Sequence, residues 1–577
     1  MADAETNFKS EESLNPEPLS ELKSGLIEDP TRRLTRKLPV SHVWITSAYY
    51  YPTSKSLGDN AVAMAMVVDT INFNVNNATY NIIGSNSTHT EASLATSQTE
   101  GVPTCRYAPA MARANTVENV TKLEMESNGI KVEIPFKMAR YTAPKPVIIC
   151  ISPQFVAEQW QIFMMHVHVA NRFGGHLHIY LTSIIESFFE LMKEYERQGY
   201  ITLDYWIRMK FQHTQTPYFE PNENIEWRNQ AGAQTDCLLQ YKEAAEYIAF
   251  FDMDDILFPK NYPTYLEEFN AEWALQPRAT SVFYGRREHE FVKAETLDEF
   301  SFIDLIKSLR SSPTVKRGKV VVKPDRYNST WIHYSNNENE ATRRSIDNPT
   351  IVHVQRPLQK HGNNNITKLW KMEFGPLNET IRAHDVKAME DDLNRFRKIP
   401  TISEIAPKLP SEDFYLPIVF KCYYDAFYDN AFDHRRAKHG CPNADTCELP
   451  QRKEYKCTIS IGDTGVTLAT LNDTIPATNF SCGANRFQEF IPQLFNSSQC
   501  KNLKDPMNVC CVAHDSCYNS QVGKDPCDNM FCECLSMATE KNLCAVDAAG
   551  LCAAVRLFGQ TAYETLGGSQ GVSPSIN

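Results

Sequence analysis

The chain has 577 residues and is 42% hydrophobic, so it is long enough for more than one domain and can bury large cores. Its 58 basic and 70 acidic residues give a net charge of −12 without a long basic tract, which argues against nucleic acid as a partner. No stretch approaches the roughly 18 uninterrupted apolar residues of a membrane-spanning helix.

Residues 1–37 are polar and charged, so we expect them to be disordered, and they contain no apolar segment typical of a signal peptide or anchor. The cysteines point the other way, because thirteen of the 17 lie between Cys441 and Cys552, a density typical of a disulfide framework. Nine glycosylation sequons agree with an oxidising compartment: Asn77, Asn86, Asn119, Asn328, Asn365, Asn378, Asn472, Asn479 and Asn496. We therefore expect a secretory-pathway protein whose sequence has lost an N-terminal signal or anchor.

Residues 38–143 carry short β-type runs separated by polar turns, which predicts a β-rich accessory region. Strands and helices alternate from residue 144. The helices are expected at residues 153–173, at 183–198 behind a capping box of Ser183 and Glu186 and ended by Gly199, and at 229–245. The intervening strands predict a mostly parallel, doubly wound α/β sheet over residues 144–430.

The fourth strand of this sheet, Tyr247 to Phe251, stops at three carboxylates, Asp252, Asp254 and Asp255. Ligands of open α/β sheets bind beyond the carboxyl ends of the strands, and oxygen ligands two residues apart suit a hard divalent cation. Such a cation can neutralise the diphosphate that leaves a nucleotide-sugar. The alternative is an acidic turn that caps the next helix.

Two features beyond this cluster also allow two interpretations. The basic stretch from Lys316 to Arg326 either contacts a diphosphate or forms a solvated loop or edge strand. His353 lies on a short predicted strand, where a histidine is either a ligand or a packed or surface residue. A helix ending near Asp429 is expected to close the domain, and the composition changes sharply at residues 430–440.

Several ordered motifs within residues 40–430 resemble glycosyltransferase family 92: CISPQFVAEQW, FFDMDDILFP, IVHVQRP, HGNNNITKLWKMEFGPLNET and LPSEDFYLP. The resemblance implies a GT-A fold, an inverting mechanism, a divalent cation that is usually manganese, and a Golgi membrane enzyme. It also implies transfer of galactose from UDP-galactose to a glycan acceptor.

Carried over to this sequence, the Asp-x-Asp motif of that family falls on Asp252 and Asp254, which would bind the metal and the nucleotide-sugar. His353 would be a further metal ligand. An inverting transfer needs a general base on the acceptor hydroxyl, and the candidates are Glu288, Glu290 and Asp413.

The cysteine-rich end divides into a linker, residues 431–479, and a small predicted domain, residues 480–577. In NVCCVAHDSCY and the following DPCDNMFCECL, two helices stapled by disulfides could bring Asp528 against His514. The histidine would then deprotonate a water molecule, the carboxylate would orient it, and calcium held partly by Asp515 would polarise an ester. The alternative is a disulfide scaffold in which these side chains only pack.

The same runs resemble secreted phospholipase A2, which implies that His514 and Asp528 are catalytic and that Asp515 binds calcium. The expected calcium loop keeps Cys482 and Gly483 but lacks further glycines, so weak or absent lipase activity is expected. The functions left open are a transferase with this second module, a calcium-dependent phospholipase acting on the sn-2 ester, and a non-catalytic secreted or luminal binding protein. Two adjacent genes merged into one sequence would explain the sharp boundary.

Overall fold

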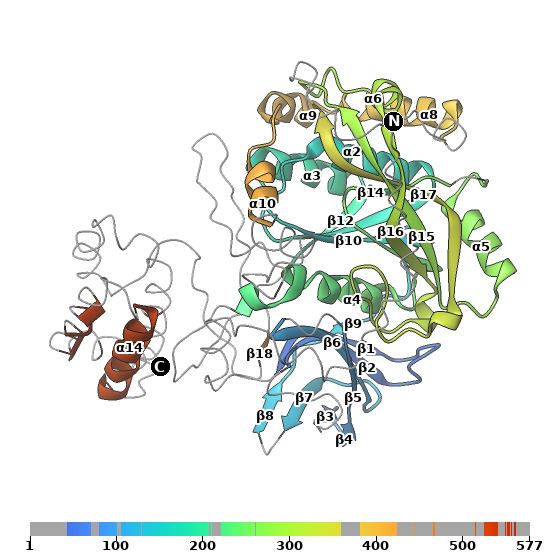
Figure 1. Cartoon of the computed structure of the whole chain (residues 1–577). Helices are drawn as coiled ribbons and strands as arrows, with labels where there is room; N and C mark the ends of the chain where they lie inside the picture. Colours follow the sequence, from blue (N-terminus) through green and yellow to red (C-terminus); the bar gives the residue numbers. More distant parts are fainter. Residues whose placement is uncertain are drawn as a thin grey trace, which may run out of the picture.

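The computed structural model describes most of the first 423 residues and scattered parts of the rest (Figure 1). The described residues are 43–70, 80–100, 105–127, 130–206, 209, 221–259, 261–358, 381–423, 441, 466–467, 510, 514, 518, 524–539, 548–549, 551–553, 555–556, 559–560 and 563. The expected disordered segment, residues 1–37, lies outside this set. Within it, no helix is long and apolar enough to cross a membrane.

The β-rich region contains two sheets. The first has the order β18 (Val466–Thr467), β1 (Val43–Tyr51), β2 (Ala61–Asp69), β6 (Tyr107–Asn115) and β5 (Thr96–Thr99), with β9 (Lys137–Met138) also paired to β1. The second has the order β4 (Thr90–Leu94), β3 (Asn81–Ser85), β7 (Lys122–Ser127) and β8 (Ile130–Glu133).

Strand β2 is buried along its whole length because its two faces pack against different partners. Val62, Met64 and other large side chains face the core of the β-rich region. The small residues Ala61, Ala63 and Ala65 face Leu239 of helix α4 (Gln230–Tyr241), and their size lets the helix approach closely.

The large sheet has eight strands in the order β12-β11-β10-β13-β16-β15-β17-β14. Their bounds are β10 (Val147–Gln154), β11 (Gly175–Leu181), β12 (Ile201–Tyr205), β13 (Tyr247–Phe251), β14 (Asp255–Leu257), β15 (Ser281–Val292), β16 (Arg310–Val322) and β17 (Arg343–Leu358). The first four in this order are parallel, as predicted. The other half is mixed, which corrects the prediction there: β15 and β17 are parallel, but β16 runs antiparallel to both β13 and β15, and β14 runs antiparallel to β17.

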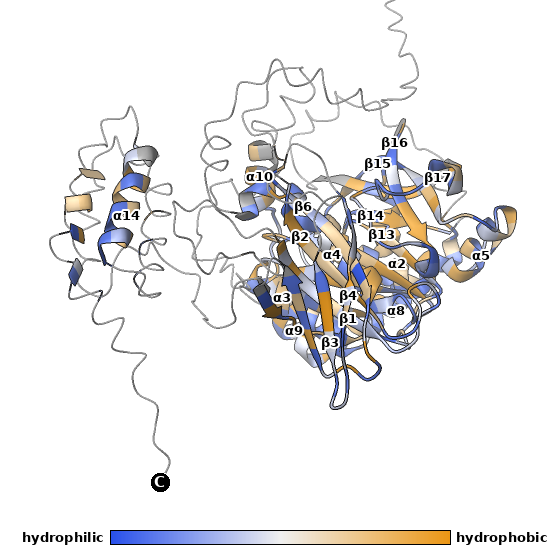
Figure 2. Ribbon diagram, turned by 90° about the horizontal axis from the view of Figure 1, so that it is seen from below, coloured by the Kyte–Doolittle hydropathy of each residue, from blue (hydrophilic) through white to orange (hydrophobic). Residues whose placement is uncertain are grey.

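Helices cover both faces of the parallel half, as a doubly wound sheet requires (Figure 1). Helices α2 (Trp160–Arg172), α3 (Glu186–Arg197), α5 (Tyr265–Leu275), α6 (Phe302–Ser308), α8 (Ala383–Phe396) and α9 (Pro400–Ile405) share the larger core with one face. Helix α4 packs on the other face and separates the large sheet from the β-rich region. Figure 2 shows hydrophobic colour along the strands of the sheets and mixed colour on helices such as α3.

Short elements complete this part of the chain. They are α10 (Tyr415–Tyr423) and the 3-10 turns η2 (Pro221–Asn224), η3 (Glu226–Asn229), η4 (Pro324–Arg326), η5 (Glu340–Thr342) and η7 (Ala406–Lys408). The expected end of the closing helix, near Asp429, lies outside the described residues.

The expected capping box is wrong. Helix α3 begins at Glu186 without a side-chain cap, and the Ser183 hydroxyl instead accepts a hydrogen bond from the backbone N–H of Val156 at 2.7 Å. The local spacing predicts that Ser183 caps the helix, but its hydroxyl instead binds a loop from another part of the chain. The predicted stop is confirmed, because α3 ends just before Gly199, whose φ of 81° favours glycine.

Disulfide bonds join distant parts of the chain. Cys150 of β10 is bonded to Cys237 of α4, and Cys105 is bonded to Cys441 across a sequence separation of 336 residues. Cys441 thus pairs outside the cysteine-rich tail, whose thirteen cysteines cannot all pair with one another. In the tail, helix α14 (Lys524–Ala538) carries the Cys510–Cys534 and Cys532–Cys552 bonds.

Candidate active site

The acidic cluster lies in the tight connection between β13 and β14. All of β13 is buried, and the N–H of Asp255 donates to the carbonyl of Asp252 at 3.1 Å, which folds the chain back at once. Oxygen atoms of Asp252, Asp254 and Asp255 all lie within 4.8 Å of one another. The alternative of a helix cap is wrong, because a strand follows and the next helix, α5, is capped by Thr264.

Two cations, one buried and one partly buried, face these carboxylates. The Lys319 ammonium, on the central strand β16, lies 2.7 Å from Asp252 Oδ2, and Arg286 of β15 lies 3.2 Å from both oxygens of Asp255. Burial alone would raise the pKa of Asp252, but the charge of Lys319 lowers it to about 2. Burial keeps the pKa of Asp255 above its ordinary value.

The interpretation of residues 316–326 as a solvated loop or edge strand is therefore wrong for Lys319, which is only 1% exposed. Its contacts are Asp252 and, at 2.8 Å, the carbonyl of Ile332. Arg286 was not singled out from the sequence, because only the pairing of β15 with β16 and β17 brings it to the cluster.

His353 joins the cluster from strand β17, which is far longer than the predicted short strand. Its register places it opposite both Asp255 and Glu288. The imidazole Nε2 lies 3.3 Å from Asp254 Oδ2, and Nδ1 lies 2.5 Å from Glu288 Oε2. Burial alone would lower the pKa of His353, but the charges of Asp254 and Asp255 raise it to about 10.

Glu288 thus orients the histidine. Burial would raise the pKa of this carboxyl, but the hydrogen bond from His353 lowers it to about 2, and Lys316 adds a cation 3.4 Å away. Carboxylate–histidine pairs of this kind commonly fix a metal-binding imidazole.

The other two candidates for the general base are Glu290 and Asp413. Glu290 is buried on β15, two residues beyond Glu288. Asp413 precedes α10 and forms an ion pair with Lys293 at 2.8 Å. The structure therefore brings Glu288, but not Asp413, into contact with His353.

An unusual backbone segment precedes helix α4. Trp227, Arg228 and Asn229 have φ values of 48°, 54° and 59°, so three consecutive residues other than glycine are left-handed. Each costs about 1–3 kcal/mol and persists only where the surroundings impose it. The segment delivers Gln230, whose amide donates to Asp252 Oδ1 at 2.7 Å. Nothing in the sequence signals this turn, since no glycine marks it.

The donor set fits a divalent cation. Asp252 and Asp254 offer partly exposed carboxylate oxygens, and His353 offers a nitrogen beside them, whereas Asp255 is fully buried against Arg286. Carboxylate oxygens suit hard divalent cations such as magnesium, calcium and manganese.

Comparisons with known proteins identify relatives of this chain. The model of "Glycosyltransferase family 92" matches residues 145–397. Glycosyltransferase family 92 protein ZK381.2 of Caenorhabditis elegans is 66% identical over 435 residues, which cover 75% of this chain and 86% of that protein. A second family 92 protein of this worm is 39% identical over 457 residues and 87% of its length.

The protein is thus a glycosyltransferase by class, and within that class the chain belongs to glycosyltransferase family 92. The predicted resemblance is confirmed for this part of the chain.

Two solved structures show remote similarity. Staphylococcus aureus TarS in complex with UDP gives a TM-score of 0.19 at 10% identity over 36% of this chain and 60% of that one. The mannosyltransferase PcManGT of Pyrobaculum calidifontis, in complex with GDP-Man and Mn2+, gives 0.21 at 10% identity over 52% and 87%. Similarity at this level does not establish a shared fold.

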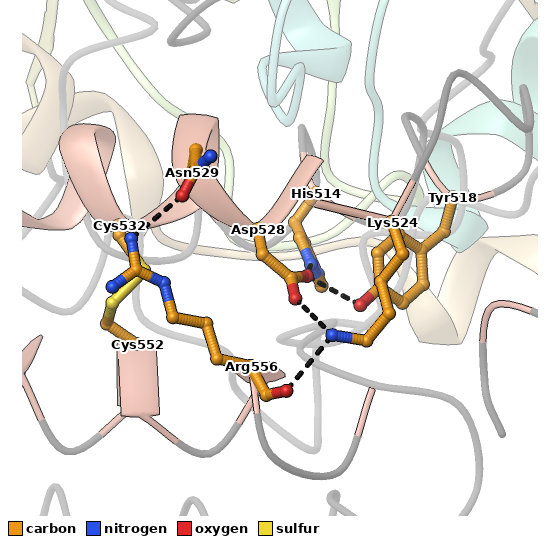
Figure 3. The surroundings of a disulfide bond; sticks show 8 residues. All are labelled: His514, Tyr518, Lys524, Asp528, Asn529, Cys532, Cys552 and Arg556. Carbon is orange, nitrogen blue, oxygen red and sulfur yellow. Dashed lines mark hydrogen bonds and ion pairs between the residues drawn. A yellow bond between two sulfur atoms is a disulfide. The ribbon is translucent and has the colours of Figure 1, made fainter. Parts of the chain in front are cut away.

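The C-terminal part holds a second polar cluster (Figure 3). His514 Nε2 lies 2.9 Å from Asp528 Oδ1, and the Tyr518 hydroxyl donates to the same oxygen at 2.6 Å. Lys524 donates to Asp528 Oδ2 at 2.7 Å. Burial lowers the pKa of His514. The expected meeting of His514 with Asp528 is confirmed, while Asp515, Cys482 and Gly483 lie outside the described residues.

A phospholipase A2-like protein of Caenorhabditis elegans is 36% identical over 101 residues, which cover 17% of this chain and 58% of that protein. The similarity concerns a small part of the chain.

Proposed function

We propose that this chain moves galactose from UDP-galactose to a glycan acceptor with inversion, in a GT-A arrangement that depends on manganese. The observation that carries the proposal is the meeting of Asp252, Asp254 and His353 beyond the buried strand β13. This is the edge at which open α/β sheets bind nucleotides.

Asp252, Asp254 and His353 would hold the cation, with Glu288 fixing the imidazole through Nδ1. When bound, the cation supplies positive charge to the leaving diphosphate. Lys319 and Arg286 balance the charge of Asp252 and Asp255, which keeps the loop compact despite three adjacent carboxylates.

The acceptor hydroxyl must lose a proton as the new bond forms. Glu288 is held by His353 and Lys316, so we assign it to positioning the histidine. Asp413 and Glu290 are then the candidates for the general base. The family resemblance and the disulfide bonds support a Golgi or secreted location.

Replacing Asp254→Asn tests the metal assignment. We expect transfer from UDP-galactose to fall at least 100-fold and manganese binding to weaken, because a charged oxygen ligand is lost. The measurement is transfer from a panel of UDP-sugars with and without manganese, beside manganese titration. The control is Asp391→Asn, an exposed carboxylate of α8, which should change neither value. Unchanged transfer by a folded Asp254→Asn protein would show that the metal assignment is wrong.

A second candidate function is calcium-dependent hydrolysis of the sn-2 ester of phospholipids. The contact between His514 and Asp528 favours it, and the similarity to a phospholipase A2-like protein supports it. The contact between Lys524 and Asp528 argues against high lipase activity, because the ammonium charge of Lys524 stabilises the Asp528 carboxylate independently of His514. A module that binds calcium, lipid or a protein partner without catalysis is the remaining alternative.

A further inference from the structure

One face of helix α4 lies on the parallel strands, and its first residue reaches the loop beyond the carboxyl end of β13. Residues 230, 234, 237 and 241 share this face at helical spacing. Tyr241 contacts His178 of β11 at 3.2 Å, Cys237 is bonded to Cys150 of β10, and Gln230 binds Asp252 beyond β13. Gln234 therefore lies between the disulfide and the acidic cluster, over the edge where the proposed donor would bind.

The side chain of Gln234 is fully buried, with 0% exposure, and within the described part of the chain neither its amide nitrogen nor its oxygen has a hydrogen-bond partner. Two more buried groups at this edge share that property, the hydroxyl of Thr182 and the indole nitrogen of Trp206. Thr182 directly follows β11 and Trp206 directly follows β12.

These groups belong to the side of the sheet that α4 covers. Tyr180 and Trp206 pack with Ala233 and Cys237 of α4, and the two rings lie 5.2 Å apart. Side chains alternate along a strand, so Thr182 faces the same side as Tyr180.

More than about 90% of the buried polar groups in proteins have a hydrogen-bond partner. A buried polar group that lacks one costs about 1–3 kcal/mol. Three such groups at the ligand-binding edge of one sheet are available to pair with a bound molecule. We propose that Gln234, together with Thr182 and Trp206, binds the pyrimidine base of the nucleotide-sugar. This rests on the proposed transferase function and adds the residues that recognise the donor.

The hydrogen-bond donors and acceptors of these three side chains favour a pyrimidine base. The amide of Gln234 offers an acceptor oxygen and an NH2 group with two donors, the indole N–H of Trp206 only donates, and the hydroxyl of Thr182 does either. Uracil has two carbonyl oxygens flanking one N–H, so its edge can pair with the amide and still accept from the indole. Guanine has one carbonyl oxygen on that edge, which the amide and the indole would have to share.

The test replaces Gln234→Met, which keeps the volume and removes both polar atoms. We expect the melting temperature of the free protein to rise, because an unpaired buried amide is removed, and the Kd for UDP to increase about tenfold or more. Calorimetric titration of the full chain with UDP and with GDP, in the presence of manganese, measures binding without requiring transfer. Thr182→Val, a smaller change, should shift both values in the same directions.

The matched control is Gln161→Met on α2. Its amide is paired, since it donates to the carbonyl of Ala294 at 2.7 Å and accepts from the N–H of the same residue at 3.0 Å. This variant should lower the melting temperature and leave the Kd for UDP unchanged.

The outcomes separate the two proposals. If wild type binds UDP and both Gln234→Met and Thr182→Val bind it equally well, the assignment of these residues is wrong while the transferase stands. Tighter binding of GDP than of UDP would overturn the pyrimidine assignment. If wild type binds neither nucleotide, the proposed function fails together with this inference.

Discussion

At the scale of single residues, the acidic cluster is a problem of charge balance. Three carboxylates lie within one short turn, and two of them are matched by Lys319 and Arg286, both delivered by neighbouring strands. Removing one partner of such a buried pair leaves the other charge uncompensated, which is costly. The third carboxylate, Asp254, is not paired with either of these two cations, and its neighbour is the imidazole of His353.

Buried histidines away from this cluster predict an acid-sensitive fold. Burial, with help from nearby His178, lowers the pKa of His176 to about 4, below the value of about 6.5 for an unfolded histidine. Between pH 6.5 and 4 the unfolded chain therefore binds more protons, and stability falls as the pH falls through that window. One such group contributes at most about 1.4 kcal/mol per pH unit.

His176→Asn should therefore flatten the dependence of the unfolding free energy on pH across this window, as measured by guanidinium titration at several pH values. The imidazole of His176 also contacts the Thr202 hydroxyl at 2.9 Å, so some loss of stability at pH 7 is expected as well. His384→Asn is the control, since that side chain is 67% exposed on α8. An unchanged slope in His176→Asn would contradict the prediction.

At the scale of elements, the sequence predicted what local pattern encodes. The strand Tyr247–Phe251 and the carboxylates at its end follow from composition alone, and so does the stop of α3 at Gly199. The antiparallel pairs of the sheet could not be predicted, because strand order depends on which distant segments pair. For the same reason Arg286, Gln230 and Gln234 were missed, since they reach the site only through pairing of strands and packing of α4.

One loop shows how the β-rich region supports this site. Residues 329–337 place the carbonyl of Ile332 on Lys319 and the indole of Trp331 on Glu226. Glu100, at the end of β5, anchors this loop. It accepts from the Ser329 hydroxyl at 2.6 Å, from the Asn336 N–H at 2.8 Å and from the Ser335 hydroxyl.

Glu100→Gln should loosen this loop. A carboxylate accepts through both oxygens, whereas an amide presents a donor on one side, so one of the loop's donors loses its partner. We expect the unfolding free energy to fall by about 1–3 kcal/mol and the KM for the sugar donor to rise severalfold. Denaturant unfolding and transfer kinetics measure the two effects.

The control for Glu100→Gln is Asp392→Asn, a buried carboxylate that holds His168 at 2.8 Å on the other side of the large sheet. It should lower stability without raising KM. Equal effects of the two variants on KM would mean that Glu100 acts only through overall stability.

At the scale of the whole molecule, the chain holds two polar sites, and different elements and disulfide bonds hold each of them in place. The transferase site depends on strands β13 to β17, whereas His514 and Asp528 depend on α14 and on the Cys510–Cys534 bond. No described residue belongs to both sets of contacts. The Cys105–Cys441 bond ties the β-rich region to the start of the cysteine-rich part, so the chain is covalently joined there by more than its backbone.

This separation predicts independent losses. Asp254→Asn should abolish sugar transfer and leave any phospholipid hydrolysis unchanged, while His514→Gln should do the reverse, because neither substitution touches a contact of the other site. Both activities should be measured on the same preparation of each single variant and of the double variant, with calcium and manganese supplied separately. If His514→Gln lowered transfer as much as hydrolysis, the C-terminal part would have to support the transferase directly, and the two sites could not be treated as separate catalysts.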